Sequence, residues 1–110
     1  MFELRVYKTV AGKRGELSDR FRDHTAVMFE QAGMENVGYW TAATGEDSDD
    51  TFVYMLGYPS LEARDDMWGT LGENPEFQRI IVSAERSDDR RLVDTIDARM
   101  LVPTEFSAIR

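Results

Sequence analysis

The spacing of hydrophobic positions changes along the chain, and each change marks a predicted element. Residues 2–7 alternate between apolar and polar side chains, which is typical of a β-strand with two different faces. From about residue 13 to residue 32 the apolar positions recur every three or four residues, which predicts one long amphipathic helix. Gly33 is typical of the residue that ends such a helix.

The apolar stripe of this helix is formed by Leu17, Phe21, His24 and Met28. At about 100° per residue, these four positions fall within a stripe about 60° wide. Charged side chains lie on the opposite side of the helix. The pattern therefore predicts that His24, the only histidine of the chain, faces the sheet.

The middle of the chain predicts two strands joined by a polar loop. Residues 37–43 and 51–58 are rich in aromatic and β-branched side chains, which favour strands. The loop at residues 45–50 is acidic but lacks the regular carboxylate spacing of a calcium-binding loop, so we interpret it as a solvated turn. The two strands are expected to form an antiparallel hairpin.

The remainder of the chain predicts two helical segments and a last strand. Ser60 is a favourable N-cap for the first segment, and Asn74 followed by a proline starts the second. The residues expected on the inner faces are Leu61, Arg64, Trp68 and Leu71 in the first segment, and Phe77, Ile80, Ile81 and Ala84 in the second. Residues 92–102 alternate again and predict the last strand, which Pro103 ends.

The element order is strand, helix, strand, strand, helix, strand, and no repeat or linker interrupts residues 1–110. This is the order of the ferredoxin-like βαββαβ fold, which belongs to the α+β class. We therefore expect one domain, with a four-stranded antiparallel sheet whose helices cover one face.

The strand at residues 51–58 carries large apolar side chains on both of its faces. Phe52, Tyr54 and Leu56 point to one side, whereas Val53 and Met55 point to the other. The helices of one chain cover only one face of a sheet, so we expect a second copy to cover the other face, sheet against sheet. The alternative is a monomer with an amphipathic open face.

Composition excludes several classes of site. The chain has 110 residues, no cysteine, one histidine and a net charge of -8. A disulfide scaffold, a cysteine nucleophile and metal sites built on cysteine or several histidines are thereby excluded. The acidic balance argues against nucleic acid and anionic membranes as partners. We expect no metal and no cofactor, and the lack of an apolar leader or spanning segment favours a cytoplasmic location.

Five stretches, taken in order, resemble the NIPSNAP family. These are residues 2–7, 21–24, 29–34, 37–41 and 103–107, of which Gly38-Tyr39-Trp40 and Pro103-Thr104-Glu105-Phe106-Ser107 are the more specific. The resemblance covers almost the whole chain. It implies a dimeric α+β barrel, which agrees with the argument from the two apolar faces. It implies no established reaction.

His24 is the candidate catalytic residue. A polar ring on an apolar stripe needs a hydrogen-bond partner, because an unsatisfied polar group costs about 1–3 kcal/mol when buried. It is either a core histidine with one such partner or a base or donor that lines a pocket. The resemblance gives the two interpretations equal weight, because dimeric α+β barrels often hold a ligand between the long helix and the sheet.

The chain is also rich in amphipathic aromatic rings, which suit a small apolar or aromatic ligand. The candidate ligand-binding residues are Phe21, Met28, Tyr39, Trp40, Tyr54 and Trp68. The alternative is a core that is simply rich in these residues. Charged residues on the first strand, Glu3 and Arg5, are expected to form structural ion pairs with Asp97 and Arg99 across the neighbouring last strand.

Two hypotheses of function follow. The first is a homodimer that binds a small apolar or aromatic ligand between the first helix and the sheet, without metal or nucleotide. The second is a cofactor-independent monooxygenase or isomerase of the dimeric α+β barrel type, with His24 as its base. Haem chemistry is disfavoured, because haem-degrading proteins of this fold pair an asparagine on the first strand with a tryptophan and a histidine. This chain has Trp68, but Tyr7 on the strand and no second histidine.

Overall fold

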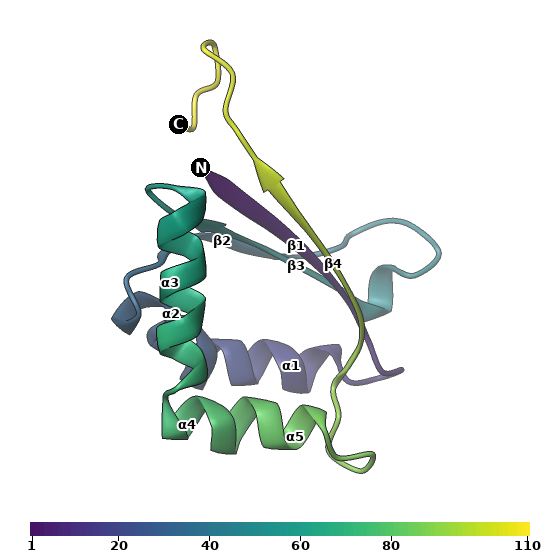
Figure 1. Cartoon of the computed structure of the whole chain (residues 1–110). Helices are drawn as coiled ribbons and strands as arrows, with labels where there is room; N and C mark the ends of the chain where they lie inside the picture. The colour runs from purple at the N-terminus through teal and green to yellow at the C-terminus, as the bar shows by residue number, and fades with distance from the viewer.

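A computed structural model describes residues 1–110 and contains one four-stranded antiparallel sheet. Its strands are β1 (Phe2–Thr9), β2 (Glu35–Thr41), β3 (Thr51–Gly57) and β4 (Val93–Leu101), in the spatial order β2-β3-β1-β4. The helices all lie on one face of this sheet (Figure 1). The predicted α+β class and the ferredoxin-like strand order are confirmed.

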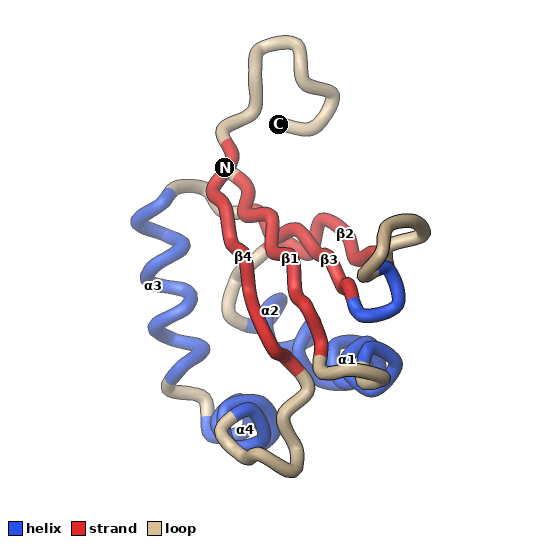
Figure 2. Tube along the Cα trace, turned by 90° about the vertical axis from the view of Figure 1, so that its right-hand side faces the viewer, coloured by secondary structure: helices blue, strands red, loops and turns tan.

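The helices form two regions, and each contains a π-helical turn. The first comprises α1 (Arg14–Arg20), the π turn η1 (Phe21–Thr25) and α2 (Ala26–Gln31). The second comprises α3 (Leu61–Gly72), α4 (Pro75–Phe77), the π turn η3 (Gln78–Val82) and α5 (Ser83–Glu85), and a short 3-10 helix, η2 (Ser48–Asp50), lies in the acidic loop. The chain turns sharply between α3 and α4 (Figure 2). None of these helices combines the length and the apolar character that a membrane span requires.

Both predicted N-caps of the second helical region are present. The Ser60 hydroxyl accepts a hydrogen bond from the amide of Ala63 at 3.0 Å. The Asn74 side chain accepts one from the amide of Glu76 at 2.9 Å. The turn between α3 and α4 therefore follows from the sequence, because Asn74 leaves the helix and starts the next one. Leu61, expected on the inner face, is 50% exposed because it belongs to the first turn of α3.

The prediction that His24 faces the sheet is wrong. The first helical region buries Leu17, Phe21, Thr25 and Phe29, which are spaced by four residues each. A π turn accommodates one more residue than an α turn, so the position after Phe21 that points inward is Thr25. His24 is rotated outward and is exposed to solvent.

The sheet turns the mixed polar face of β1 toward the helices. Arg5 lies opposite Tyr54 in the β1–β3 ladder, and Tyr54 is fully buried under the helices. Asp97 and Arg99 lie opposite Val6 and Leu4, so they belong to the other face of the sheet. The expected ion pairs of Glu3 and Arg5 with the last strand are therefore wrong.

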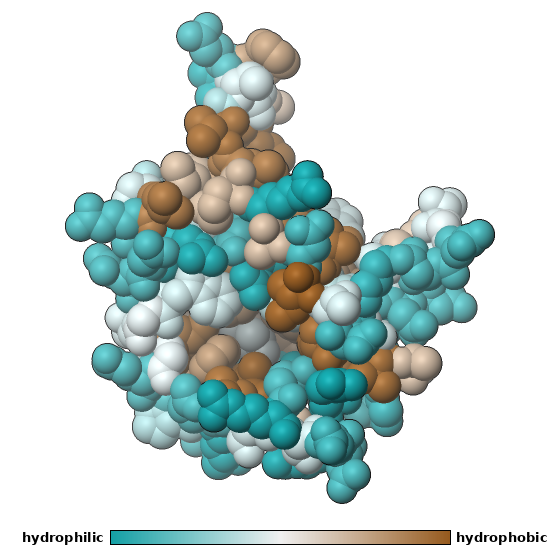
Figure 3. Space-filling view, turned by 45° about the vertical axis from the view of Figure 1, so that its right-hand side comes forward, coloured by the Kyte–Doolittle hydropathy of each residue, from teal (hydrophilic) through white to brown (hydrophobic).

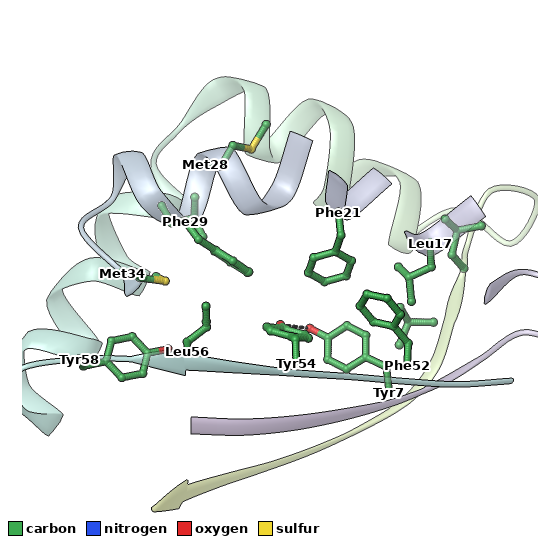
Figure 4. Packing of buried hydrophobic residues seen from close by; sticks show 13 residues of the cluster. Tyr7, Leu17, Phe21, Met28, Phe29, Met34, Phe52, Tyr54, Leu56 and Tyr58 are labelled. Atoms are coloured by element: carbon green, nitrogen blue, oxygen red, sulfur yellow. Dashed lines mark hydrogen bonds between the residues drawn. The ribbon is translucent and has the colours of Figure 1, made fainter. Parts of the chain in front are cut away.

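The core is an aromatic layer between the sheet and the first helical region. The ring of Phe21 lies 4.9 Å from that of Tyr54, 5.0 Å from that of Phe52 and 6.0 Å from that of Tyr7. Phe29 and Leu17 extend the layer on either side of Phe21 (Figure 4). These contacts hold α1 and α2 against β1 and β3.

Trp40 and Phe106 are among the large apolar side chains that stay exposed outside this core. The Trp40 side chain, on the face of the sheet without helices, is 51% exposed. The segment after Pro103 extends past the end of the sheet, as Figure 1 shows, and its Phe106 is 89% exposed. The face of the sheet opposite the helices therefore carries apolar surface that this chain does not cover.

The positions of side chains after the π turn η1 predict different losses of stability for two alanine substitutions. Phe29→Ala removes a ring that is 1% exposed and contacts Phe21, Tyr54 and Trp68, so we expect a loss of about 3–5 kcal/mol in the free energy of unfolding. His24→Ala should change it by no more than about 0.5 kcal/mol, because its side chain is exposed. Urea denaturation measures both, and a large loss in His24→Ala would contradict the register.

Candidate functional site

A cavity of about 480 Å³ lies between the sheet and the two helical regions. Its lining includes Arg5 and Tyr7 from β1, Ile96 from β4, Phe29 from α2, Trp68 from α3 and Ile81 from η3. The hollow near the centre of Figure 3 opens on this side of the molecule. Helix α5 contacts the start of β4 through Glu85 but leaves the middle of that strand uncovered, so Ile96 is 51% exposed beside the cavity.

A second groove, of about 380 Å³, lies on the other side of the first helical region. Phe21 separates it from the cavity, Tyr39 of β2 forms its other wall, and Trp40 borders it at the edge of the sheet. Its one charged neighbour, Arg22, is 69% exposed and paired with Asp19 and Asp23. The cavity between the helices and the sheet is the stronger candidate site, because buried charged groups line it.

Glu3 is the centre of these buried charges. Its carboxylate is 1% exposed and accepts hydrogen bonds from Arg64 at 3.0 and 3.1 Å, from Arg5 at 3.0 Å and from the Tyr58 hydroxyl at 2.8 Å. Burial alone would raise the pKa of Glu3, but the hydrogen bonds from Arg64 and Tyr58 and the charge of Arg5 outweigh it and lower the pKa. Glu3 is therefore ionised at neutral pH.

Arg5 extends this cluster to the wall of the cavity. It donates from Nε to the Tyr54 hydroxyl at 2.6 Å, from Nη1 to Glu3 and from Nη2 to the Tyr7 hydroxyl at 3.0 Å. Its guanidinium also lies over the ring of Trp68, 4.8 Å from the centroid. Burial opposes its charge, but Tyr54, Tyr7 and Glu3 hold the pKa of Arg5 above its ordinary value. The cavity therefore has a fixed cation in its floor.

Two tyrosines complete the floor. The hydroxyls of Tyr7 and Tyr54 are 2.7 Å apart and share one hydrogen bond. Burial, with Tyr7 close by, raises the pKa of Tyr54, so this phenol stays protonated at neutral pH. Trp68 donates from its indole nitrogen to the Tyr58 hydroxyl at 2.9 Å, which fixes the Trp68 ring beside Arg5.

Two further ion pairs lie at the rim. Arg20 of α1 contacts Glu85 of α5 at 2.9 Å. The Glu85 carboxylate also accepts from the amides of Leu92 and Val93, so it joins the start of β4 to both helical regions. Nowhere in the chain do three or more histidine, aspartate or glutamate side chains gather where they would hold a metal ion.

The predicted site residues are distributed over different surfaces. Phe21 and Trp68 line the cavity, and Tyr54 lies beneath its floor. Tyr39 and Trp40 line the second groove. The structure thus brings the first three residues together and separates the two residues of β2 from them.

The other two predicted residues lie away from the cavity. Met28 is buried, but it faces Leu71 of α3 and not the cavity. His24 lies on the outer surface beside Asp23 and Glu76. The hypothesis of His24 as a base between helix and sheet therefore fails on its position.

Sequence reasoning missed Glu3, Arg5, Tyr7 and Arg64 as residues of the site. Their signal was present, because three polar residues alternate along β1 and Arg64 falls on the inner face of its predicted helix. The alternation shows that these residues share a face, but it does not show which face the helices cover. For that reason the pattern predicts only structural ion pairs between these charges and the neighbouring strand.

The lowered pKa of Glu3 makes part of the stability depend on pH. A carboxyl whose pKa is lower in the folded state stabilises the fold above its unfolded pKa, and this contribution is lost as pH falls through the folded pKa. Glu3→Gln should therefore lower the free energy of unfolding by about 3 kcal/mol at pH 7. The difference from the unmodified chain should shrink when pH falls below about 4.

Denaturation in urea at pH 7 and pH 3.5 measures this difference. Glu76→Gln is the matched control, because Glu76 also pairs with an arginine but is 59% exposed, so its effect on the free energy of unfolding should be small. Equal effects of the two substitutions at pH 7 would show that the buried cluster contributes no more than a surface pair.

Comparison with known proteins places the chain in a family. The family model described as NIPSNAP matches residues 2–108. A crystal structure of a NIPSNAP family protein from Agrobacterium tumefaciens is 27% identical, with a TM-score of 0.85 over 99% of this chain and 97% of that one.

Two further structures share the fold. An uncharacterised NIPSNAP-like domain protein from Burkholderia xenovorans is 23% identical, with a TM-score of 0.81 over 96% of this chain and 86% of that one. A NIPSNAP family protein with unknown function from Agrobacterium tumefaciens is 19% identical, with a TM-score of 0.85 over 99% and 92%. No curated protein matches the sequence. Because the family model spans nearly the whole chain, the chain belongs to the NIPSNAP family.

Proposed function

We propose that the chain acts as a homodimer that binds a small apolar or aromatic ligand in the cavity between the helices and the sheet, without metal or nucleotide. The observation that carries this proposal is the cavity of about 480 Å³ itself, which has apolar walls and hydrogen-bond donors in its floor. Ligand sites in proteins combine these two features, since the walls supply burial and a few polar groups fix orientation.

The walls suit a flat apolar molecule. Phe29 and Trp68 meet edge to face, with ring centroids 5.5 Å apart, and form one side. Ile81 and Ile96 form the side toward η3 and β4. An aromatic or apolar ligand of modest size would bury both aliphatic and aromatic surface here, and it would cover the exposed part of Ile96.

The open face of the sheet supports a homodimer. Leu4 and Val6 of β1 lie beside Val53 and Met55 of β3 on the face that carries no helix, and Trp40 is half exposed at its edge. Unpartnered apolar surface of this kind drives association. A second copy, packed sheet against sheet, would cover both open faces at once.

The ligand proposal predicts that filling the cavity removes binding. With 2-naphthamide as a neutral aromatic probe, we expect one molecule to bind per chain in isothermal titration calorimetry. Ile81→Trp places a larger ring in the cavity and should weaken binding at least tenfold. Val27→Trp, at a position that is 48% exposed on the outer side of α2, is the matched control and should leave affinity unchanged. Equal affinity of both variants would refute the cavity as the site.

The dimer proposal predicts that a charge on the open face separates the subunits. In multi-angle light scattering we expect twice the 12.6 kDa mass of one chain. Val53→Lys should shift this mass toward that of the monomer at micromolar concentration, because two lysines would be buried in the sheet-to-sheet contact. Asp49→Lys in the exposed loop introduces the same side chain, with a larger change of charge, and should leave the dimer intact. A monomeric unmodified chain would overturn the proposal.

A further inference from the structure

We propose that the ligand of this cavity is an acid, whose carboxylate or equivalent oxyanion is held by the Tyr7 hydroxyl and the Arg5 guanidinium. This inference rests on the proposed function and adds the chemical class of the ligand. Three features of the floor carry it: the direction of the Tyr7 proton, the unused donors of Arg5 and the charge left on the cluster.

The hydrogen bond between the two tyrosines has only one satisfactory direction. The Tyr54 hydroxyl already accepts from Arg5 and is fully buried, and its one other polar neighbour is the Tyr7 hydroxyl. If Tyr7 donated to Tyr54, the Tyr54 proton would be left in the core without an acceptor, at a cost of about 1–3 kcal/mol. Tyr54 therefore donates to Tyr7.

This direction leaves the Tyr7 proton free to be donated. The Tyr7 hydroxyl accepts from both Arg5 and Tyr54, so its own proton needs another acceptor. Tyr7 lines the cavity, and no protein acceptor lies within hydrogen-bonding distance of it on that side. An acceptor on the ligand would complete the arrangement.

Arg5 adds donors next to this hydroxyl. A guanidinium has five N–H groups, of which Arg5 uses one from each nitrogen, toward Tyr54, Glu3 and Tyr7. One N–H on each terminal nitrogen remains, and the Arg5 side chain forms part of the cavity floor. The floor thus offers donors without an acceptor, which is the pattern of an oxyanion site.

The charge of the cluster has the matching sign. Glu3 is the only carboxylate bonded to Arg5, and Arg64 binds both oxygens of that carboxylate. Two buried or half-buried cations therefore share one buried anion. Asp65 also contacts Arg64, at 3.0 Å, but it is 66% exposed and does not line the cavity.

The other charges of the cavity do not compensate Arg5. Arg20 is paired with Glu85 at 2.9 Å, and Arg91 lies 4.0 Å from Asp94. Each of these rim pairs is neutral as a unit. The residues that line the cavity therefore carry one net positive charge, and a ligand with one negative charge would balance it.

A matched pair of probes tests this inference. 2-Naphthoate and 2-naphthamide share one ring system and differ in the charge of the substituent. We expect naphthoate to bind about tenfold more tightly in calorimetry, because hydrogen bonds to a charged acceptor are stronger than those to a neutral one. In the Trp40→Phe background, the remaining indole N–H resonance, that of Trp68, should shift with both probes and so locates them in the cavity.

Substitutions separate the charge effect from the shape of the cavity. Arg64→Met removes one of the two arginines bonded to Glu3, so the carboxylate then neutralises Arg5 alone. Although Arg64 does not line the cavity, this substitution should reduce the preference for naphthoate about tenfold. The affinity for naphthamide should not change. Arg79→Met removes the same charge from an exposed site on η3 and should leave the preference intact. Tyr7→Phe should also reduce the preference for naphthoate over naphthamide, and thermal melting shows whether that variant is folded.

The outcomes distinguish this inference from the proposed function. Naphthamide bound as tightly as naphthoate, with the Trp68 resonance shifted, would overturn the inference and leave the proposed function standing. A preference that survives Arg64→Met and Tyr7→Phe would also overturn it. Failure of both probes to bind would overturn the inference and the proposed function together.

Discussion

The buried carboxylate of Glu3 determines how the second helical region meets the sheet. A carboxylate without water is costly to bury unless donors surround it. Here the donors come from β1, from the end of β3 and from α3, through Arg5, Tyr58 and Arg64. Helix α3 is therefore attached to the sheet by polar contacts at one end, and the helices that follow it contact β4 only at its start, through Glu85, and leave its middle uncovered. The cavity is the space that results.

The first helical region is attached in a different way. It lies on the sheet through aromatic contacts centred on Phe21, which bury apolar surface. Tyr7 and Tyr54 belong to both the aromatic core and the polar floor, because each places its ring in the core and its hydroxyl in the floor. The fold thus combines a dry half, which supplies stability, with a polar half, where hydrogen-bond geometry specifies the position of each group.

The sequence predicted the order of elements, because periods of two and of about 3.6 distinguish strands from helices in this chain. It also predicted Ser60 and Asn74 as caps, since their chemistry is local. It did not predict the face that β1 turns to the helices, because alternation is the same in both orientations and Leu4 is as suitable for burial as Tyr7. It placed His24 wrongly because the stripe with His24 assumes an unbroken α-helix, and apolar spacing contains no signal for a π turn.

The two π turns relate directly to the cavity. One lies in each helical region, and both supply lining residues: Phe21 and Thr25 from η1, and Ile81 from η3. A π turn costs backbone energy relative to an α turn, and such turns occur frequently at functional sites. In η1 the inserted residue turns Thr25 and Phe29 inward, which directs Phe29 to the cavity wall, and His24 lies outside on the surface. The insertion that breaks the α-helical spacing therefore also places Phe29 in the wall of the candidate site.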